Sequence, residues 1–209
     1  MALTAAAGPR IGVFGGAFDP PHAAHSALVR AALAQLDLTE LRIFPTGQAW
    51  HKERPLSAAE HRLAMSRLAF EGIDGAVVDA REILRPGPTY TLDTLRELAA
   101  ERPGCSLVLI VGADQARALP RWHGFEQILS IAIISVAERA ASAGLPEGFD
   151  PSALQALAPA ARFEPLHLPS MDISATEIRA RAARGDALGG LVAPAVARYI
   201  DNHHLYRST

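Results

Sequence analysis

Short apolar runs alternate along this chain with longer stretches whose apolar residues recur at helical spacing. A bounded apolar run is typical of a buried strand, and apolar positions about three or four apart indicate a helix with one buried face. The predicted strands are 11–14, 41–44, 76–78, 107–111, 132–136 and 163–166. The predicted helices are 22–36, 58–70, 91–100 and 176–183. This alternation predicts βαβ units and therefore an α/β fold around a parallel sheet.

Two long loops are predicted, at 46–55 and 140–150. The first follows the carboxyl end of a strand, which is where ligands bind in open α/β sheets. It is therefore the more interesting of the two for function.

The composition fits a globular protein without a strong electrostatic preference. The chain has 209 residues, 49% hydrophobic and 20% charged, which predicts a single domain, 1–209. The net charge of −2 predicts no general attraction to nucleic acid or anionic membranes, so an anionic ligand needs a local site. The lone Cys105 excludes an internal disulfide, and the N-terminus lacks a signal-peptide pattern. With no apolar run long enough to span a membrane, we expect a cytoplasmic protein.

The first predicted strand leads into a turn that ends in two histidines. Gly15 and Gly16 follow the strand directly, where the lack of side chains lets phosphates approach the backbone. His22 and His25 are three residues apart, so they share one face of the helix beside the free N–H groups of its first turn. Imidazole donors at a helix N-terminus favour a phosphate-binding site.

Two other interpretations of the histidines stay open at this point. They could be solvated side chains at a helix start, or they could bind a metal ion. A metal is less favoured, because the neighbouring Asp19 precedes two prolines and no third ligand follows at a recognised spacing. An NAD-dependent oxidoreductase is also disfavoured, because the turn lacks the G-x-G-x-x-G pattern of dinucleotide-binding folds.

A second helix start near the C-terminus carries similar chemistry. Ser174 and Glu177 form a capping-box pattern, which by itself requires nothing beyond a stable helix N-terminus. Arg179 adds a guanidinium one turn into the helix, and a hydroxyl with an arginine at such a position suits an anion. Two such anion sites in one α/β chain indicate a nucleoside triphosphate that spans both.

The segments GGAFDPPHAAH and ISATEIR together resemble the nucleotidylyltransferase superfamily, which has a (T/H)-x-G-H motif after its first strand and a late ISxTxxR motif. The likeness extends to the bacterial nicotinate-nucleotide adenylyltransferases through PTGQAWHK, PTYTLDTL, VGADQ, LPRWHGFEQIL and YIDNHHLY. The resemblance implies a Rossmann-like, doubly wound parallel sheet with helices on both faces. It also implies adenylyl transfer from ATP to nicotinate mononucleotide, a step of NAD biosynthesis that releases pyrophosphate.

The resemblance also implies roles for individual residues. His22 and His25 would be catalytic and hold the α-phosphate of ATP, as neutral or protonated donors. The residues implied to bind ATP are Gly15, Gly16, Phe18 with its backbone, Gly112, Asp114, Ile173, Ser174 and Arg179. The residues implied to bind nicotinate mononucleotide are His51, Lys52, Tyr90, Thr91, Trp122 and His123. The C-terminal helical part, about 170–209, would complete the ATP site.

Two departures from the family pattern leave alternatives. Ala24 stands where relatives have a glycine between the histidines, and VAERA, 136–140, stands where many have an arginine-proline stretch. The basic residue that binds the mononucleotide phosphate is therefore not assigned. It could be Arg139 or a residue elsewhere in the chain. The acceptor could instead be nicotinamide mononucleotide or, less favoured, phosphopantetheine. The departures also keep open a nucleotide-binding regulator without catalysis on the same fold.

The residues of the candidate site suit phosphate chemistry without a general base. A phosphate monoester is already largely dianionic at pH 7, so the task left to the protein is positioning and charge stabilisation. We expect Mg²⁺ to arrive with ATP and to be held chiefly by the phosphates rather than by protein side chains. The expected partners are ATP and nicotinate mononucleotide, with no nucleic acid and no membrane. The oligomeric state, a homo-oligomer included, is left open.

Overall fold

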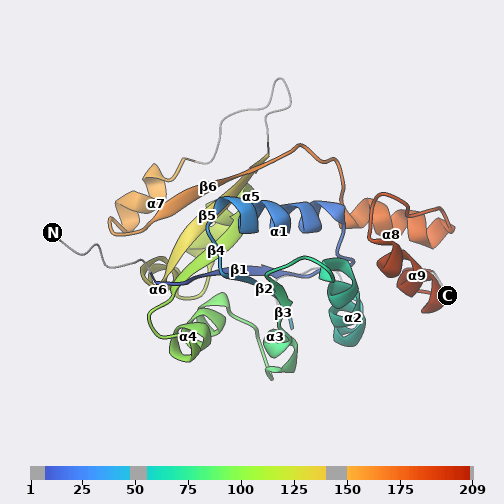
Figure 1. Ribbon diagram of the computed structural model, residues 1–209, viewed down its shortest axis with the longest axis horizontal. Helices are drawn as coiled ribbons and strands as arrows, with labels where there is room; N and C mark the ends of the chain where they lie inside the picture. The colour runs from blue at the N-terminus through green and yellow to red at the C-terminus, as the bar shows by residue number, and fades with distance from the viewer. Residues whose placement is uncertain (1–7, 48–55, 140–149, 208–209) are drawn as a thin grey trace.

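The computed structural model describes residues 8–47, 56–139 and 150–207. Within them, six parallel strands form one sheet in the order β3-β2-β1-β4-β5-β6, which Figure 1 shows. The strands are β1 Arg10–Gly16, β2 Glu40–Pro45, β3 Ala76–Val78, β4 Ser106–Gly112, β5 Ala132–Arg139 and β6 Phe163–Leu168. Each predicted strand lies within one of these, so the α/β prediction is confirmed. The order reverses between β1 and β4, and ligands bind such sheets outside the carboxyl ends of the strands at that point.

Helices connect the strands and cover the sheet. The four predicted helices correspond to α1 Ala23–Gln35, α2 Ala59–Phe70, α4 Thr91–Glu101 and α8 Ala175–Arg184. The helices that were not predicted are α3 Arg81–Leu84, α5 Ala113–Ala118, α6 Phe125–Ile131, α7 Ser152–Leu157, α9 Pro194–Asn202 and the 3₁₀ turn η1 Leu119–Arg121. Most of these are shorter than two turns, which is too short to display a helical period in the sequence.

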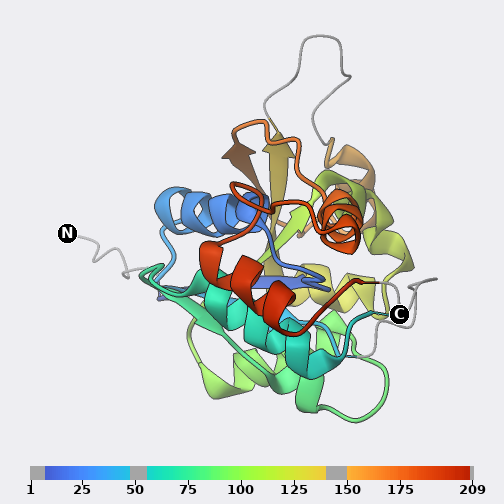
Figure 2. The same cartoon turned by 90° about the vertical axis from the view of Figure 1, so that its right-hand side faces the viewer.

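Successive residues of each central strand point to opposite faces of the sheet, where two separate apolar clusters form. In β4, Val108 and Ile110 join a cluster with residues of α1, α2, α8 and α9. Leu107, Leu109 and Val111 join the other cluster, with residues of α4, α5, α6 and α7. In Figure 2 the blue α1 and the yellow-green α5 lie on opposite sides of the strands. The doubly wound arrangement with helices on both faces is therefore confirmed.

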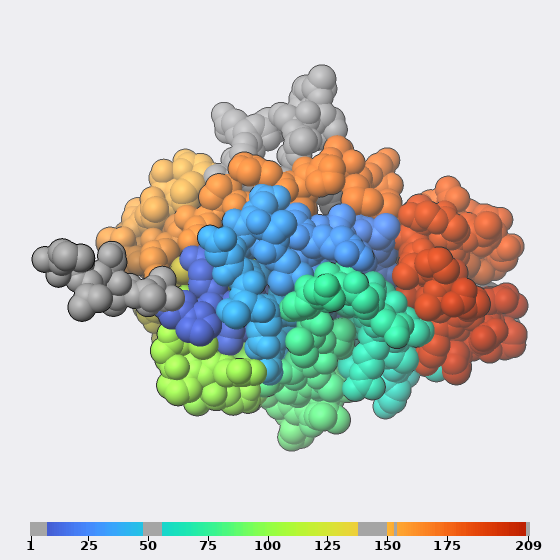
Figure 3. Space-filling model, viewed as in Figure 1, coloured from blue at the N-terminus to red at the C-terminus, as the bar shows by residue number. Residues whose placement is uncertain are grey.

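The C-terminal part of the chain lies at one end of the molecule, beside α2. Ile178 of α8 and Val196 and Ile200 of α9 are buried in the same cluster as α1 and α2. The backbone N–H of Ala23, at the start of α1, donates to the carbonyl of Leu191 at 2.8 Å. Figures 1 and 3 show α8 and α9 packed as one block against this end. Because α1 begins just after β1, this block borders the carboxyl end of β1.

Most of the two predicted long loops, and with them His51 and Lys52, lie outside the described residues. The predictions for these two residues therefore stay predictions. Among the helices that the structure describes, none combines the length and the apolarity needed to cross a membrane.

Candidate active site

The two predicted histidines begin α1, directly after the turn that follows β1. His22 is the N-cap residue of α1, and the Nδ1 atom of His25 accepts a hydrogen bond from the backbone N–H of His22 at 3.2 Å. The centroids of the two rings are 3.7 Å apart and the rings are stacked, with an interplanar angle of 25°. The helix start therefore places both imidazoles side by side at the positive end of the α1 dipole.

Phe18 supports the His25 ring from the core. Its side chain is buried, and its ring meets the His25 ring edge-on with the centroids 5.1 Å apart. The φ angle of Phe18 is 48°, a left-handed conformation that costs a bulky residue on the order of 1–3 kcal/mol and persists only where packing imposes it. Phe14 and Phe70 supply that packing, with ring centroids 5.5 and 5.7 Å from Phe18. The Phe18 side chain is thus structural, and only its backbone is left for the predicted ATP contact.

The environment of His25 determines its protonation. Burial and, to a lesser extent, the neighbouring His22 lower the pKa of His25 from 6.5 to about 3, so the ring is neutral at pH 7. Because Nδ1 accepts a hydrogen bond, the single proton of the neutral ring sits on Nε2. Of the two protonation states left open by the sequence, the structure favours a neutral N–H donor at His25.

The second predicted motif caps α8 and reaches the first one. The Ser174 hydroxyl accepts the backbone N–H of Glu177 at 3.2 Å, as the capping pattern predicts. The Glu177 carboxylate pairs with Arg181 along the same helix at 2.8 Å. The Nη1 atom of Arg179 donates to the backbone carbonyl of Asp19 at 2.8 Å, across 160 residues of sequence. Two motifs that are far apart in the chain therefore meet in the structure.

A cavity of about 560 Å³ opens at the carboxyl ends of β1 and β4. Of the residues predicted to bind nucleotides, those that line it are Gly15, Gly16, Gly112, Tyr90, Thr91, Trp122 and His123. His22, His25, Ser174 and Arg179 are not part of this lining. Ala17 does line it, and this residue begins the turn that leads to the histidines. The turn from Ala17 to His22 therefore runs from the cavity wall to the phosphate motifs.

Gly15, the last residue but one of β1, and Gly112, the last residue of β4, have open space in front of them. A Cβ atom built at either position would meet no atom within 4 Å, and neither residue has a positive φ angle. The protein itself therefore does not require glycine there, whereas a ligand that approaches the backbone closely would. Gly16 differs, because a Cβ there would come within 3.0 Å of the Phe18 ring.

Aromatic and helix-terminal groups line the other side of the cavity. Tyr90 is the N-cap residue of α4 and Thr91 is its first residue. The rings of Tyr90 and His123 lie with their centroids 4.5 Å apart. Trp122 is half-buried and packs in part against the apolar cluster on this face of the sheet. This side of the cavity therefore offers a planar aromatic ring next to the positive end of a helix dipole.

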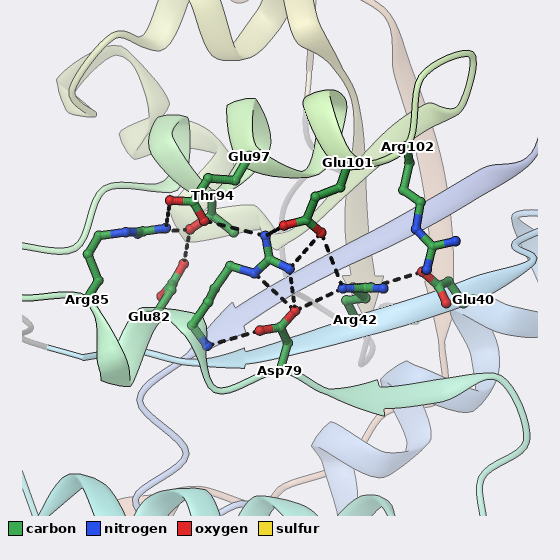
Figure 4. A network of polar contacts seen from close by, with 10 residues as sticks. Glu40, Arg42, Asp79, Glu82, Arg85, Thr94, Glu97, Glu101 and Arg102 are labelled. Carbon is green, nitrogen blue, oxygen red and sulfur yellow. Dashed lines mark hydrogen bonds and ion pairs between the residues drawn. The ribbon is translucent and has the colours of Figure 1, made fainter.

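Sequence reasoning missed Glu82, which lines the same cavity. Its carboxyl is buried and accepts a hydrogen bond from the Thr94 hydroxyl at 2.8 Å, which Figure 4 shows. Burial raises the pKa of Glu82 to about 7, although the Thr94 hydrogen bond and the charge of Arg85 act in the opposite direction. Figure 4 also shows the wider network of ion pairs next to it, in which Arg85 binds Glu97 at 2.7 Å. The sequence alone does not reveal that Glu82 is buried and hydrogen-bonded, because its partner Thr94 lies on another helix.

Sequence reasoning also missed Arg62, a fully buried arginine of α2. Its guanidinium donates to the carbonyls of Ala17, at 3.0 Å, and Gly47, at 3.2 Å, which lie in the loops after β1 and β2. It also donates to the carbonyl of Ser57, just before α2, at 3.0 Å. Burial lowers the pKa of Arg62, and the negative charge of Asp19 opposes this effect. One side chain therefore ties together three segments around the cavity.

Asp114 and Ile173, which were also predicted to bind ATP, are outside the cavity lining as well. The side chain of Asp114 is 96% exposed and pairs with Arg117 one turn along α5, at 3.0 Å. Ile173 is half-buried and packs against the apolar cluster of α1 and α8. Arg121, which was not predicted, does line the cavity beside Trp122 and forms no ion pair with any described residue.

Comparison with known proteins connects this geometry to a family. A family model described as cytidylyltransferase-like matches residues 13–181. A protein of Albidiferax ferrireducens named "probable nicotinate-nucleotide adenylyltransferase" is 55% identical over 199 residues, which cover 95% of this chain and 98% of the relative. A protein of the same name from Methylibium petroleiphilum is 43% identical over 201 residues, covering 94% of this chain and 92% of the relative.

A solved structure shares the fold. Nicotinic acid mononucleotide adenylyltransferase of Plasmodium falciparum, complexed with APC, matches with a TM-score of 0.73 at 18% identity, covering 95% of this chain and 97% of that one. Given the family match over most of its length and the high identity to its relatives, this chain belongs to the cytidylyltransferase-like family and, within it, to the nicotinate-nucleotide adenylyltransferases.

Proposed function

We propose that this chain joins nicotinate mononucleotide to the adenylyl group of ATP and releases pyrophosphate, as a step of NAD biosynthesis. The observation that carries the proposal is the contact between Arg179 and the Asp19 carbonyl, because it brings the two phosphate-binding motifs to one place. The names of the relatives support the same reaction. The cavity beside these motifs leaves room for the second substrate.

The reaction needs positioned charge rather than a general base. The 5′-phosphate of the mononucleotide attacks the α-phosphorus of ATP in line, and the bond to the bridging oxygen breaks so that pyrophosphate leaves with the electron pair. We assign the α-phosphate to His22, to the Nε2–H of His25 and to the positive end of the α1 dipole. We assign the β- and γ-phosphates to Ser174 and Arg179, in the N-terminal part of α8.

The far side of the cavity supports nicotinate over nicotinamide as the ring substituent. Tyr90 and Thr91 at the start of α4 line the cavity, and the positive end of a helix dipole favours a carboxylate over a neutral amide. Trp122 offers a surface on which the pyridine ring would stack, worth roughly 0.5–1.5 kcal/mol beyond area burial. The exposed guanidinium of Arg121 is a further cation on this side.

We treat Mg²⁺ as part of the ATP substrate. Among the described residues, no group of three His, Cys, Asp or Glu side chains could hold a metal ion. Mg²⁺ prefers to keep several of its waters and to bind phosphate oxygens. The ion would then neutralise charge on the triphosphate, while the protein supplies the imidazole, hydroxyl and guanidinium donors.

The test is pyrophosphate release from Mg²⁺–ATP with nicotinate mononucleotide, with nicotinamide mononucleotide and without an acceptor. We expect release with both mononucleotides, about tenfold or more in favour of the acid, from the interaction of a carboxylate with the helix N-terminus and nearby cation. Faster release with the amide would point to the alternative acceptor. Release with neither would leave a nucleotide-binding regulator as the better interpretation.

The His25→Ala variant tests the assigned catalytic group. Removing one positioned donor to a phosphoryl transition state should lower turnover by on the order of 10²-fold. The matched control is His167→Ala, which removes an imidazole from an exposed position of β6 and should leave turnover unchanged. Near-full turnover of His25→Ala would show that the assignment is wrong even if the reaction is right.

A further inference from the structure

The last described residues, 203–207, fold back from α9 toward the first turn of the fold. His204 and Tyr206 have positive φ angles of 50° and 67°, a left-handed conformation that reverses the chain direction sharply. The backbone N–H of Leu205 donates to the carbonyl of Ile200 at 3.0 Å and closes the end of α9. This turn brings the ring of Tyr206 against the apolar cluster of α1, α2, α8 and α9.

The hydroxyl of Tyr206 reaches the turn after β1. It donates to Oδ1 of Asp19 at 2.8 Å, across 187 residues of sequence. Asp19 is only 3% exposed, and its Oδ2 accepts the backbone N–H of Ser57 at 3.3 Å. Burial and the Asp19 charge raise the pKa of Tyr206, so the hydroxyl keeps its proton and acts as a donor. A buried carboxylate deprived of such a donor is costly, which makes this contact a strong restraint on Asp19.

Asp19 in turn borders both halves of the candidate phosphate site. Its backbone carbonyl is the acceptor for Arg179 at 2.8 Å. Three residues further on, His22 begins α1 and stacks on His25. A displacement of Asp19 would therefore move the acceptor that orients Arg179, and also the turn that presents the two imidazoles.

We propose that Tyr206 is a positioning residue of the ATP site: its hydroxyl fixes Asp19 and thereby sets Arg179 and the histidines relative to each other. The inference rests on the proposed function, because it takes these residues to hold the phosphates of ATP. The C-terminal turn then contributes to triphosphate binding without touching the nucleotide. Trp122 belongs to the apolar cluster on the opposite face of the sheet, so the mononucleotide side of the cavity does not depend on this hydroxyl.

The test compares Tyr206→Phe with Tyr199→Phe. Both variants remove one hydroxyl from the C-terminal part, but the Tyr199 hydroxyl is hydrogen-bonded to Nδ1 of His61, at 3.0 Å, and not to Asp19. The affinity for Mg²⁺–ATP is measured by titration calorimetry without an acceptor, and the affinity for nicotinate mononucleotide without ATP. Melting temperature and steady-state turnover are measured on the same samples.

For Tyr206→Phe we expect about a tenfold loss of ATP affinity, a similar loss of turnover and an unchanged affinity for the mononucleotide. For Tyr199→Phe we expect unchanged ATP affinity and a comparable change in melting temperature. Equal ATP affinity in the two variants would overturn the proposal. A parallel loss of both affinities in Tyr206→Phe would assign the hydroxyl a purely structural role, which also overturns it. Because binding is measured without an acceptor, a failure of the proposed reaction leaves this comparison intact.

A double-mutant cycle with Asp19→Asn tests the route through Asp19. If the hydroxyl acts through this carboxyl, the double variant loses no more ATP affinity than Asp19→Asn alone. Independent, additive losses would contradict the route. Should Asp19→Asn not fold, the comparison of Tyr206→Phe with Tyr199→Phe decides the proposal by itself.

Discussion

The chemistry of His25 depends on its two neighbours, the His22 backbone and the Phe18 ring. The N–H of His22 occupies Nδ1, and burial against Phe18 disfavours the charged imidazolium. The ring therefore presents one N–H, at Nε2, without first having to take up a proton. A neutral donor of this kind can strengthen its hydrogen bond as negative charge develops on the phosphoryl group under attack.

We expect the His25 ring signals to stay unchanged between about pH 5 and pH 8 in the ligand-free protein, because the pKa of His25 is lowered to about 3. NMR of ¹⁵N-labelled histidines measures this, with the signal assigned by its absence from His25→Gln. The control is a peptide of residues 17–30, in which the exposed imidazoles should titrate near about 6.5. A His25 signal that follows the peptide would contradict the buried, neutral state.

Glu82 makes the stability depend on pH in the opposite sense from a salt-bridged acid. The pKa of Glu82 is about 7 in the folded protein and 4.5 in the unfolded chain. Between these two pH values the folded state therefore binds more protons than the unfolded state. The free energy of unfolding therefore falls as the pH rises from 4.5 toward 7, and the contribution is lost above pH 7. Glu82→Gln cannot ionise but keeps an oxygen that accepts the Thr94 hydroxyl.

The expected result is that Glu82→Gln is more stable than the unmodified chain at about pH 8, by on the order of 1–3 kcal/mol, and similar to it near about pH 5. Urea unfolding at the two pH values measures the difference. A difference that is the same at both pH values would mean that Glu82 is not protonated in the folded state at low pH.

At the scale of elements, a substitution near the end of β1 can distinguish the stability of the fold from the binding of a ligand. An alanine at Gly15 would meet no protein atom within 4 Å. We expect Gly15→Ala to leave stability unchanged or raise it by up to about 1 kcal/mol, through the entropy of the unfolded chain. The same methyl group should raise the KM for ATP by about tenfold, because it enters the space where the nucleotide approaches the backbone.

The control for Gly15→Ala is Gly189→Ala. Gly189 also has no atom within 4 Å of a built Cβ and is exposed between α8 and α9. Thermal unfolding and steady-state kinetics of both variants measure the two effects. If the KM for ATP stays normal in Gly15→Ala, the open space in front of β1 is not where ATP binds.

Elements were predictable where the sequence is long enough to show a period. Apolar runs mark the central strands most clearly, whereas Glu164 and His167 interrupt the apolar residues of β6. The helices α1, α2, α4 and α8 each span at least ten residues. The helices α3, α5, α6 and α7 have four to seven residues, so no period develops and only tertiary contacts reveal them. The glycines and histidines of the candidate site were predictable for another reason: they cluster in two short motifs.

At the scale of the whole molecule, buried polar side chains connect segments that no local pattern relates. Arg62 reaches the Ala17 carbonyl across 45 residues, and Tyr206 reaches Asp19 across 187. In the sequence, an arginine within an amphipathic helix is indistinguishable from a solvated one. The motifs could therefore be predicted from the sequence, but the side chains that hold the motifs together could not.

Arg62→Met tests how much of the fold depends on one of these connections. Methionine keeps most of the volume but leaves the carbonyls of Ala17 and Gly47 without their guanidinium donor and removes a positive charge that acts on Asp19. We expect the free energy of unfolding to fall by about 3 kcal/mol or more.

Arg67→Met is the matched control, because it removes an exposed arginine from the same helix and should change stability by no more than about 0.5 kcal/mol. Arg62→Lys should recover only part of the loss, since one ammonium cannot span the three carbonyls that the planar guanidinium reaches. Guanidinium chloride unfolding measures the free energy of unfolding of the three variants, which should rise from Arg62→Met through Arg62→Lys to Arg67→Met. If Arg62→Met were as stable as Arg67→Met, the three segments around the cavity would be held by apolar packing, and the buried charge would add nothing to the fold.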